Sequence, residues 1–227
     1  MSQSPIAADD AELRSDVRRL GDLLGQTLVR QEGPELLALV EQVRKAVREG
    51  SGEEILAQLS VEDSVPLVRA FSTYFHLANV AEQVHRARVL AEARTTGGSW
   101  LAKAVDRIEA ALKAQTPGHE LSKEEITEWV GSMSVRPVFT SHPTEAARRS
   151  VLNKLGSIAD LLDDPRNPSQ QDRLAETIDL LWQTDELRLG RPEPLDEALN
   201  ALYYLDDLFT QTVPEVLNDF AKEMKRI

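Results

Sequence analysis

The sequence contains no cysteine. Disulfides, thiolate zinc sites, iron–sulfur clusters and cysteine nucleophiles are therefore excluded, and the composition suits a reducing compartment. Long apolar runs are also missing, because no stretch approaches the roughly 18 consecutive apolar residues that a membrane span needs. The start, Met1–Arg14, is acidic and lacks the apolar core of a secretory signal. These absences predict a cytoplasmic protein with no membrane partner.

Positive charge is scarce: 26 Lys and Arg face 38 Asp and Glu, which gives a formal net charge of −12. Phosphate backbones repel such a chain unless basic residues are concentrated locally, so no nucleic-acid partner is predicted. Aromatic residues make up only 5%, while 41% of residues are hydrophobic and 28% are charged. This composition is typical of a soluble globular protein.

Apolar residues recur at helical spacing along most of the chain, which predicts a mainly α fold. An S-x-x-E capping box, Ser122 with Glu125, predicts the start of a further short helix. The periodic segments are Leu13–Leu24, Leu36–Val47, Leu67–Phe75, Leu101–Leu112, Val151–Leu162, Leu174–Leu181, Leu199–Phe209 and Val213–Met224.

One segment, Ser134–Thr140, is predicted as a strand because it is short and mixes β-branched and aromatic residues with a proline. A lone strand needs partners for its backbone N–H and C=O groups, and no second convincing strand is present. We therefore expect the chain to be incomplete and to continue beyond residue 227 into an α/β barrel. The expected domains are a helical region over 1–133 and, over 134–227, the first barrel strand with the helices after it.

The junction after this strand is the leading candidate for a catalytic site. His142 would lie on the loop at the carboxyl end of the strand, where barrel enzymes place catalytic groups. A helix is expected to begin near Pro143 or Thr144, and Arg148 and Arg149 follow within two turns of this N-terminus, which attracts anions and opposes cations. Two interpretations stay open: the arginines bind an anionic ligand, or Arg149 pairs with Glu145 while Arg148 bonds a distant carboxylate.

A helix from Ser169 to about Arg188 is predicted next, and its apolar stripe continues into Asp185 and Arg188. Either these charges are paired with each other or with outside groups such as Arg191, or the helix end emerges into solvent.

The segment Val138–Arg149, VFTSHPTEAARR, resembles the histidine motif of the phosphoenolpyruvate carboxylase family, with Ser141 where alanine is usual. Three more segments resemble the same family in the same order: Leu13–Leu24, Ala70–His85 and Thr184–Ala198. The resemblance covers nearly the whole chain. It implies the N-terminal portion of a longer, allosteric, commonly homotetrameric enzyme built around a (β/α)8 barrel.

This resemblance implies an enzyme that converts phosphoenolpyruvate and bicarbonate to oxaloacetate and phosphate, a carbon dioxide fixation that replenishes the tricarboxylic acid cycle. His142 matches the catalytic histidine, and Arg148 and Arg149 match the basic positions, with a supporting role in substrate binding. The Mg²⁺ or Mn²⁺ ligands are expected beyond residue 227, as are the other catalytic groups, so the isolated chain is expected to be inactive. The alternative is a non-enzymatic helical scaffold or regulatory module.

Overall fold

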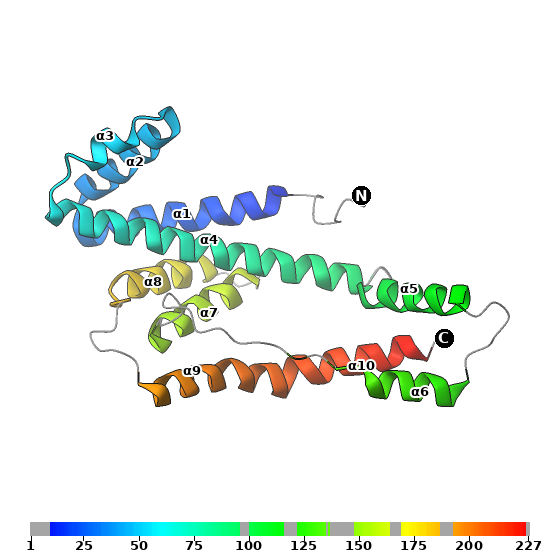
Figure 1. Cartoon of the computed structure of the whole chain (residues 1–227). Helices are drawn as coiled ribbons and strands as arrows, with labels where there is room; N and C mark the ends of the chain where they lie inside the picture. The colour runs from blue at the N-terminus through cyan, green and yellow to red at the C-terminus, as the bar shows by residue number, and fades with distance from the viewer. Residues whose placement is uncertain are drawn as a thin grey trace. The chain divides into compact units, whose positions relative to one another are not determined.

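The structure, a computed structural model, describes residues 10–95, 100–115, 122–134, 136, 148–163, 169–186 and 193–225. These residues are almost entirely helical and include no strand (Figure 1). The mainly α prediction is confirmed, and every periodic segment lies within the helical elements. They are α1 (Asp10–Glu32), α2 (Pro34–Glu49), α3 (Gly52–Leu56), α4 (Val61–Thr95), α5 (Trp100–Gln115), α6 (Lys123–Ser132), α7 (Arg149–Asp163), α8 (Gln170–Trp182), α9 (Pro194–Asp207), the π-helical turn η3 (Leu208–Thr212) and α10 (Val213–Met224).

The predicted strand, Ser134–Thr140, lies mostly outside the described residues. Ser134 and Arg136 are described, and they belong to neither a helix nor a strand. The barrel part of the fold prediction and the domain division between residues 133 and 134 therefore stay predictions.

The chain divides into two compact units. The first comprises Met1–Val89 and Ala147–Arg188, and the second comprises Leu90–Ala146 and Leu189–Ile227. Helix α4 contributes to both, since its residues up to Val89 belong to the first unit and its last residues to the second.

In the first unit the apolar stripes of α1, α4, α7 and α8 form one core. Helix α1 packs against α2 and α8, and α7 packs against α8. Apolar side chains four residues apart lie on the same side of a helix, and this spacing brings Leu20 and Leu24, and likewise Leu174 and Ile178, into the core. The most deeply buried members, none more than 4% exposed, include Leu20, Leu24, Leu77, Ile158, Leu174 and Ile178.

Two glycines shape the α1–α2–α3 region. Gly33, with φ of 100°, separates α1 from α2, and Pro34 then occupies the first position of α2, where its missing N–H costs nothing. Gly50 ends α2 in the left-handed conformation, with φ of 82°, and its backbone caps the last carbonyls of the helix.

The second unit is built from the end of α4, α5, α6, α9, η3 and α10, with α10 packed against α5. The predicted capping box is confirmed: Ser122 accepts a hydrogen bond from the Glu125 N–H, and the Glu125 carboxylate accepts one from the Ser122 N–H. Several large apolar side chains of α9, η3 and α10 are exposed: Leu195, Leu199, Leu202, Phe209, Val216 and Leu217. None of the described helices combines the length and hydropathy needed to cross a bilayer.

Candidate functional site

The three residues singled out by the sequence fall at or before the start of α7. His142 lies outside the described residues. Arg148 immediately precedes α7 and is half-buried, and its carbonyl accepts hydrogen bonds from the N–H groups of Val151 at 2.8 Å and Leu152 at 3.1 Å. Arg149 is the first residue of α7 and is exposed. The structure thus places both arginines at the start of α7 itself. The sequence predicts a helix start near residue 143 or 144, which lies outside the described residues, whereas Arg148 is not helical and α7 begins at Arg149.

The Arg148 guanidinium forms an ion pair with Asp185, with Nη2 and Oδ2 3.4 Å apart. This is the distant carboxylate that one of the two interpretations required. The pair offsets the unfavourable placement of a cation at the positive end of the helix dipole. About a third of the Arg148 side chain is exposed, so water screens the pair and its contribution to stability is small.

Asp185 does not lie on a helix. Helix α8 ends at Trp182, six residues before the predicted end at Arg188, and Asp185 is 64% exposed. Asp185 is therefore both largely exposed to solvent and paired with an outside group, Arg148, so each interpretation describes part of what the structure shows. The predicted partners Arg188 and Arg191 lie outside the described residues.

The segment that follows α8 is held against α4 by three side chains. Arg69 donates hydrogen bonds to the carbonyls of Trp182 and Thr184, and its guanidinium lies 4.6 Å from the centre of the Trp182 ring. The Glu186 carboxylate accepts from the Ser72 hydroxyl at 3.1 Å and lies 2.7 Å from Nε2 of His76. A carbonyl at a helix C-terminus has no intrahelical partner, and Arg69 supplies one to the carbonyl of Trp182, the last residue of α8.

The role of this α4 face was not predicted from the sequence. A signal was available, because residues 69, 72 and 76 follow the i, i+3, i+7 spacing of one helix face. Three polar residues on one helix face beside the apolar stripe indicate a partly buried polar contact, although they do not reveal its partner.

Together these contacts form a polar cluster, which we define as Arg69, Ser72, His76, Arg148, Asp185 and Glu186. It joins α4, the chain after α8 and the start of α7 within the first unit. Chemically, it holds a guanidinium at a helix N-terminus, an arrangement suited to an anionic ligand. The Arg148–Asp185 pair links the residue before α7 to the chain after α8.

The described residues include no group of three or more His, Asp or Glu side chains placed to hold a metal ion. His76 and His85 are nine residues apart, a spacing that puts them on opposite faces of α4. Their environments differ: His76 contacts Glu186, whereas His85 is buried and its Nδ1 has no hydrogen-bond partner among the described residues.

Comparison with known proteins identifies relatives along almost the entire chain. The sequence model of the family described as phosphoenolpyruvate carboxylase matches residues 13–227. The phosphoenolpyruvate carboxylase of Thermus thermophilus is 36% identical over 245 residues, that of Pseudomonas aeruginosa 36% over 228, and that of Alcanivorax borkumensis 32% over 232.

These alignments cover 100%, 92% and 95% of this chain, but only 26%, 25% and 26% of the respective relatives. The chain thus spans about a quarter of the length of the curated relatives that it matches. The family predicted from the histidine motif and its three flanking segments is confirmed. Because the match extends over nearly all of its residues, the chain belongs to the phosphoenolpyruvate carboxylase family.

Proposed function

We propose that this chain is the N-terminal part of a phosphoenolpyruvate carboxylase, an enzyme that carboxylates phosphoenolpyruvate with bicarbonate to give oxaloacetate and phosphate. The family match over residues 13–227 carries the proposal. The relatives bear this enzyme's name, and this chain corresponds to about a quarter of each. The remaining three quarters of the polypeptide would supply the rest of the barrel and of the active site.

In the proposed reaction, a bicarbonate oxygen attacks the phosphorus of phosphoenolpyruvate. The bond from phosphorus to the enol oxygen breaks, which releases carboxyphosphate and the enolate of pyruvate. Carboxyphosphate then yields CO₂ and phosphate, and the enolate carbon attacks CO₂ to form oxaloacetate. Both substrates and both intermediates are anions, so a site that concentrates fixed positive charge would favour each step.

The residues of this chain would act in two ways. His142 would take the proton from carboxyphosphate and hold that intermediate while CO₂ leaves, a role for which imidazole is suited at neutral pH. Arg148 and Arg149 would support binding of an anionic substrate. Their place at the start of α7 favours this role, since the helix dipole and the guanidinium charges there have the same sign.

A divalent metal, Mg²⁺ or Mn²⁺, would stabilise the negative charge of the enolate as a Lewis acid. Its ligands would lie in the polypeptide beyond residue 227.

Activity of the complete polypeptide and of this chain alone tests the proposal. We expect the complete polypeptide to form oxaloacetate from phosphoenolpyruvate, bicarbonate and Mg²⁺, measured as NADH oxidation in a coupled malate dehydrogenase assay. The isolated 227-residue chain should form none, because most catalytic groups are absent from it. A complete polypeptide without this activity would favour the alternative, a helical scaffold or regulatory module.

The His142→Asn variant of the complete polypeptide tests the proposed catalytic residue. We expect a large fall in oxaloacetate formation, of the order of 10²-fold for loss of a general acid–base group, with little change in phosphoenolpyruvate binding. His119→Asn is the matched control: it makes the same change directly after Pro117 and Gly118, residues that favour a loop, and should leave turnover unchanged. Unchanged turnover of His142→Asn would remove this residue from catalysis.

The finer features of the family complete the proposal: a (β/α)8 barrel whose first strand is Ser134–Thr140, a homotetramer, allosteric control and a cytoplasmic location. The mass of the complete polypeptide in solution tests the homotetramer directly. A monomer with full activity would contradict it.

A further inference from the structure

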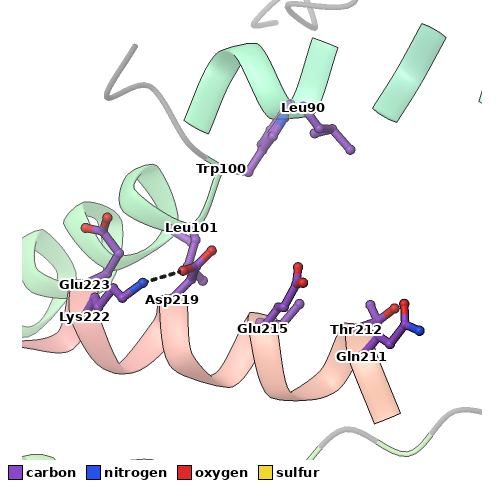
Figure 2. Close-up of a pocket in the computed structure, with 11 residues that line it drawn as sticks. Leu90, Trp100, Leu101, Gln211, Thr212, Glu215, Asp219, Lys222 and Glu223 are labelled. Atoms are coloured by element: carbon purple, nitrogen blue, oxygen red, sulfur yellow. Dashed lines mark hydrogen bonds and ion pairs between the residues drawn. The ribbon is translucent and has the colours of Figure 1, made fainter. Parts of the chain in front are cut away.

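The second unit contains an apolar groove of about 840 Å³ that the proposed reaction does not use. One wall comes from the end of α4 and from α5, and the other from η3 and α10 (Figure 2). We call it the α5–α10 groove. All of its lining residues belong to the second unit.

The groove exposes large apolar side chains. Leu90, Trp100 and Val216 line it and are 48%, 49% and 54% exposed. Burial of apolar area contributes roughly 25 cal/mol per Å², so a concave surface with three such side chains gains considerably from being covered. Concave apolar surfaces of this kind mark binding sites more often than flat ones do.

The α10 wall carries negative charge. Glu215, Asp219 and Glu223 recur every four residues along α10 and line the groove (Figure 2). Lys222 is the one cation among the described lining residues, and its Nζ lies 3.2 Å from the Asp219 carboxylate. The groove therefore presents an apolar floor beside an acidic edge.

This combination defines the chemistry of the occupant. A helix with an apolar stripe and Lys or Arg residues beside it would bury the exposed side chains and be attracted by the acidic edge. A nucleic acid or an anionic lipid would bring phosphate toward three carboxylates and be repelled. A second copy of this chain would add another net charge of −12, so it is also disfavoured.

We propose that the α5–α10 groove is the docking site for a basic amphipathic segment of the remaining three quarters of the same polypeptide. This inference rests on the proposed function, because it requires that remainder to exist. The relatives are about four times as long as the matched region, so ample chain is available to supply the segment.

Oxidation of tryptophan by hydroxyl radicals, measured by mass spectrometry on the complete polypeptide, tests the docking. Trp182 is 2% exposed and provides the buried reference, and the urea-unfolded polypeptide provides the exposed reference. We expect Trp100 to lose its reactivity and to oxidise at a rate close to that of Trp182. A rate close to that of the unfolded polypeptide would overturn the proposal.

The charge part of the proposal is tested by Glu215→Lys, which reverses a charge on the acidic edge. Glu53→Lys is the matched control, because both residues are exposed and both lie in the first turn of a helix. We expect Glu215→Lys, but not Glu53→Lys, to raise the oxidation rate of Trp100. Equal effects of the two variants would contradict an occupant held by complementary charge.

Zero-length carbodiimide cross-linking of a mixture of ¹⁴N- and ¹⁵N-labelled polypeptides identifies the occupant. We expect links from the carboxylates of α10 to lysines outside residues 1–227 of the same copy. Mixed-isotope links at α10 would show a second copy in the groove and overturn the proposal. Oxaloacetate formation by the wild-type polypeptide separates the docking proposal from the proposed carboxylase function. If the polypeptide is active but Trp100 is exposed, only the docking proposal is refuted. If it is inactive but Trp100 is shielded, only the proposed carboxylase function is refuted.

Discussion

Asp179 of α8 joins two side chains of α1, and its replacement by alanine is the most informative test of the first unit. The Asp179 carboxylate accepts from the Thr27 hydroxyl at 2.6 Å and from Nη2 of Arg30 at 2.8 Å, while Arg30 also donates to the Thr27 oxygen at 3.2 Å. Thr27 is completely buried. Asp179→Ala therefore removes a charge-assisted bond and leaves a buried hydroxyl without its acceptor.

The expected loss follows from these contacts. A hydrogen bond to a charged group contributes about 1.5–3 kcal/mol, and an unsatisfied buried hydroxyl costs about 1–3 kcal/mol. Because Arg30 is partly exposed, water screens its hydrogen bond to Asp179 and lowers the contribution of that bond. We expect the free energy of unfolding of the first unit to fall by about 2–3 kcal/mol, or roughly 30- to 200-fold in the unfolding equilibrium constant.

Urea unfolding followed by Trp182 fluorescence measures this loss, in a chain whose other tryptophans, Trp100 and Trp129, are replaced by phenylalanine. Trp182 reports on the first unit because it is buried and because its indole N–H, on α8, donates a hydrogen bond to the Glu32 carboxylate of α1. Asp163→Ala is the control: it removes a carboxylate that is 66% exposed and ion-paired with Arg88, and should cost under about 1 kcal/mol. Equal losses for the two variants would refute the reasoning.

The same contact makes a prediction about pH. Burial opposes ionisation of Asp179, but the hydrogen bonds from Arg30 and Thr27 and the Arg30 charge outweigh it, so its pKa lies below the ordinary value of 3.8. A carboxyl whose pKa is lower in the folded state stabilises the fold above the unfolded pKa and loses this contribution as pH falls through the folded pKa. The stability difference between wild type and Asp179→Asn should therefore shrink below pH 3.8. A difference that stays constant into the acid range would contradict this.

Two further substitutions test the core and the turn in the same assay. Leu174→Ala, at a completely buried position of α8, should lower the free energy of unfolding by about 2–5 kcal/mol because it leaves a cavity. A loss under about 1 kcal/mol would contradict the packing of Leu174 in the core. Gly50→Ala should lower the free energy of unfolding by about 1–2 kcal/mol. The loss would come from backbone strain alone, because φ is 82° and an added Cβ would meet nothing within 4 Å. An unchanged or higher stability would show that the backbone at Gly50 is not left-handed.

Much of the helical fold was predictable from the sequence because its signals are local. Apolar side chains at i and i+4 already share a face within one helix, and the Ser122–Glu125 capping box acts over three residues. The end of α8 was predicted too late, at Arg188. The helical spacing that led to this prediction runs on through Asp185 and Arg188, whereas the helix ends at Trp182, whose carbonyl accepts a hydrogen bond from Arg69 of another helix.

In the candidate site, too, features set by neighbouring residues were predictable from the sequence, whereas contacts between distant residues were not. The arginines at the start of α7 and the family itself could be identified from residues adjacent in the chain. A distant carboxylate was one of two possibilities for Arg148, but nothing local selected Asp185, which lies 37 residues away. The contact of Glu186 with His76 spans 110 residues.

By itself the sequence determined the helices and the family, since both are recorded in runs of neighbouring residues. Only the tertiary structure decided which charges meet. Pairing between distant side chains depends on how whole helices pack, and packing is set by the sum of many core contacts rather than by the paired residues themselves.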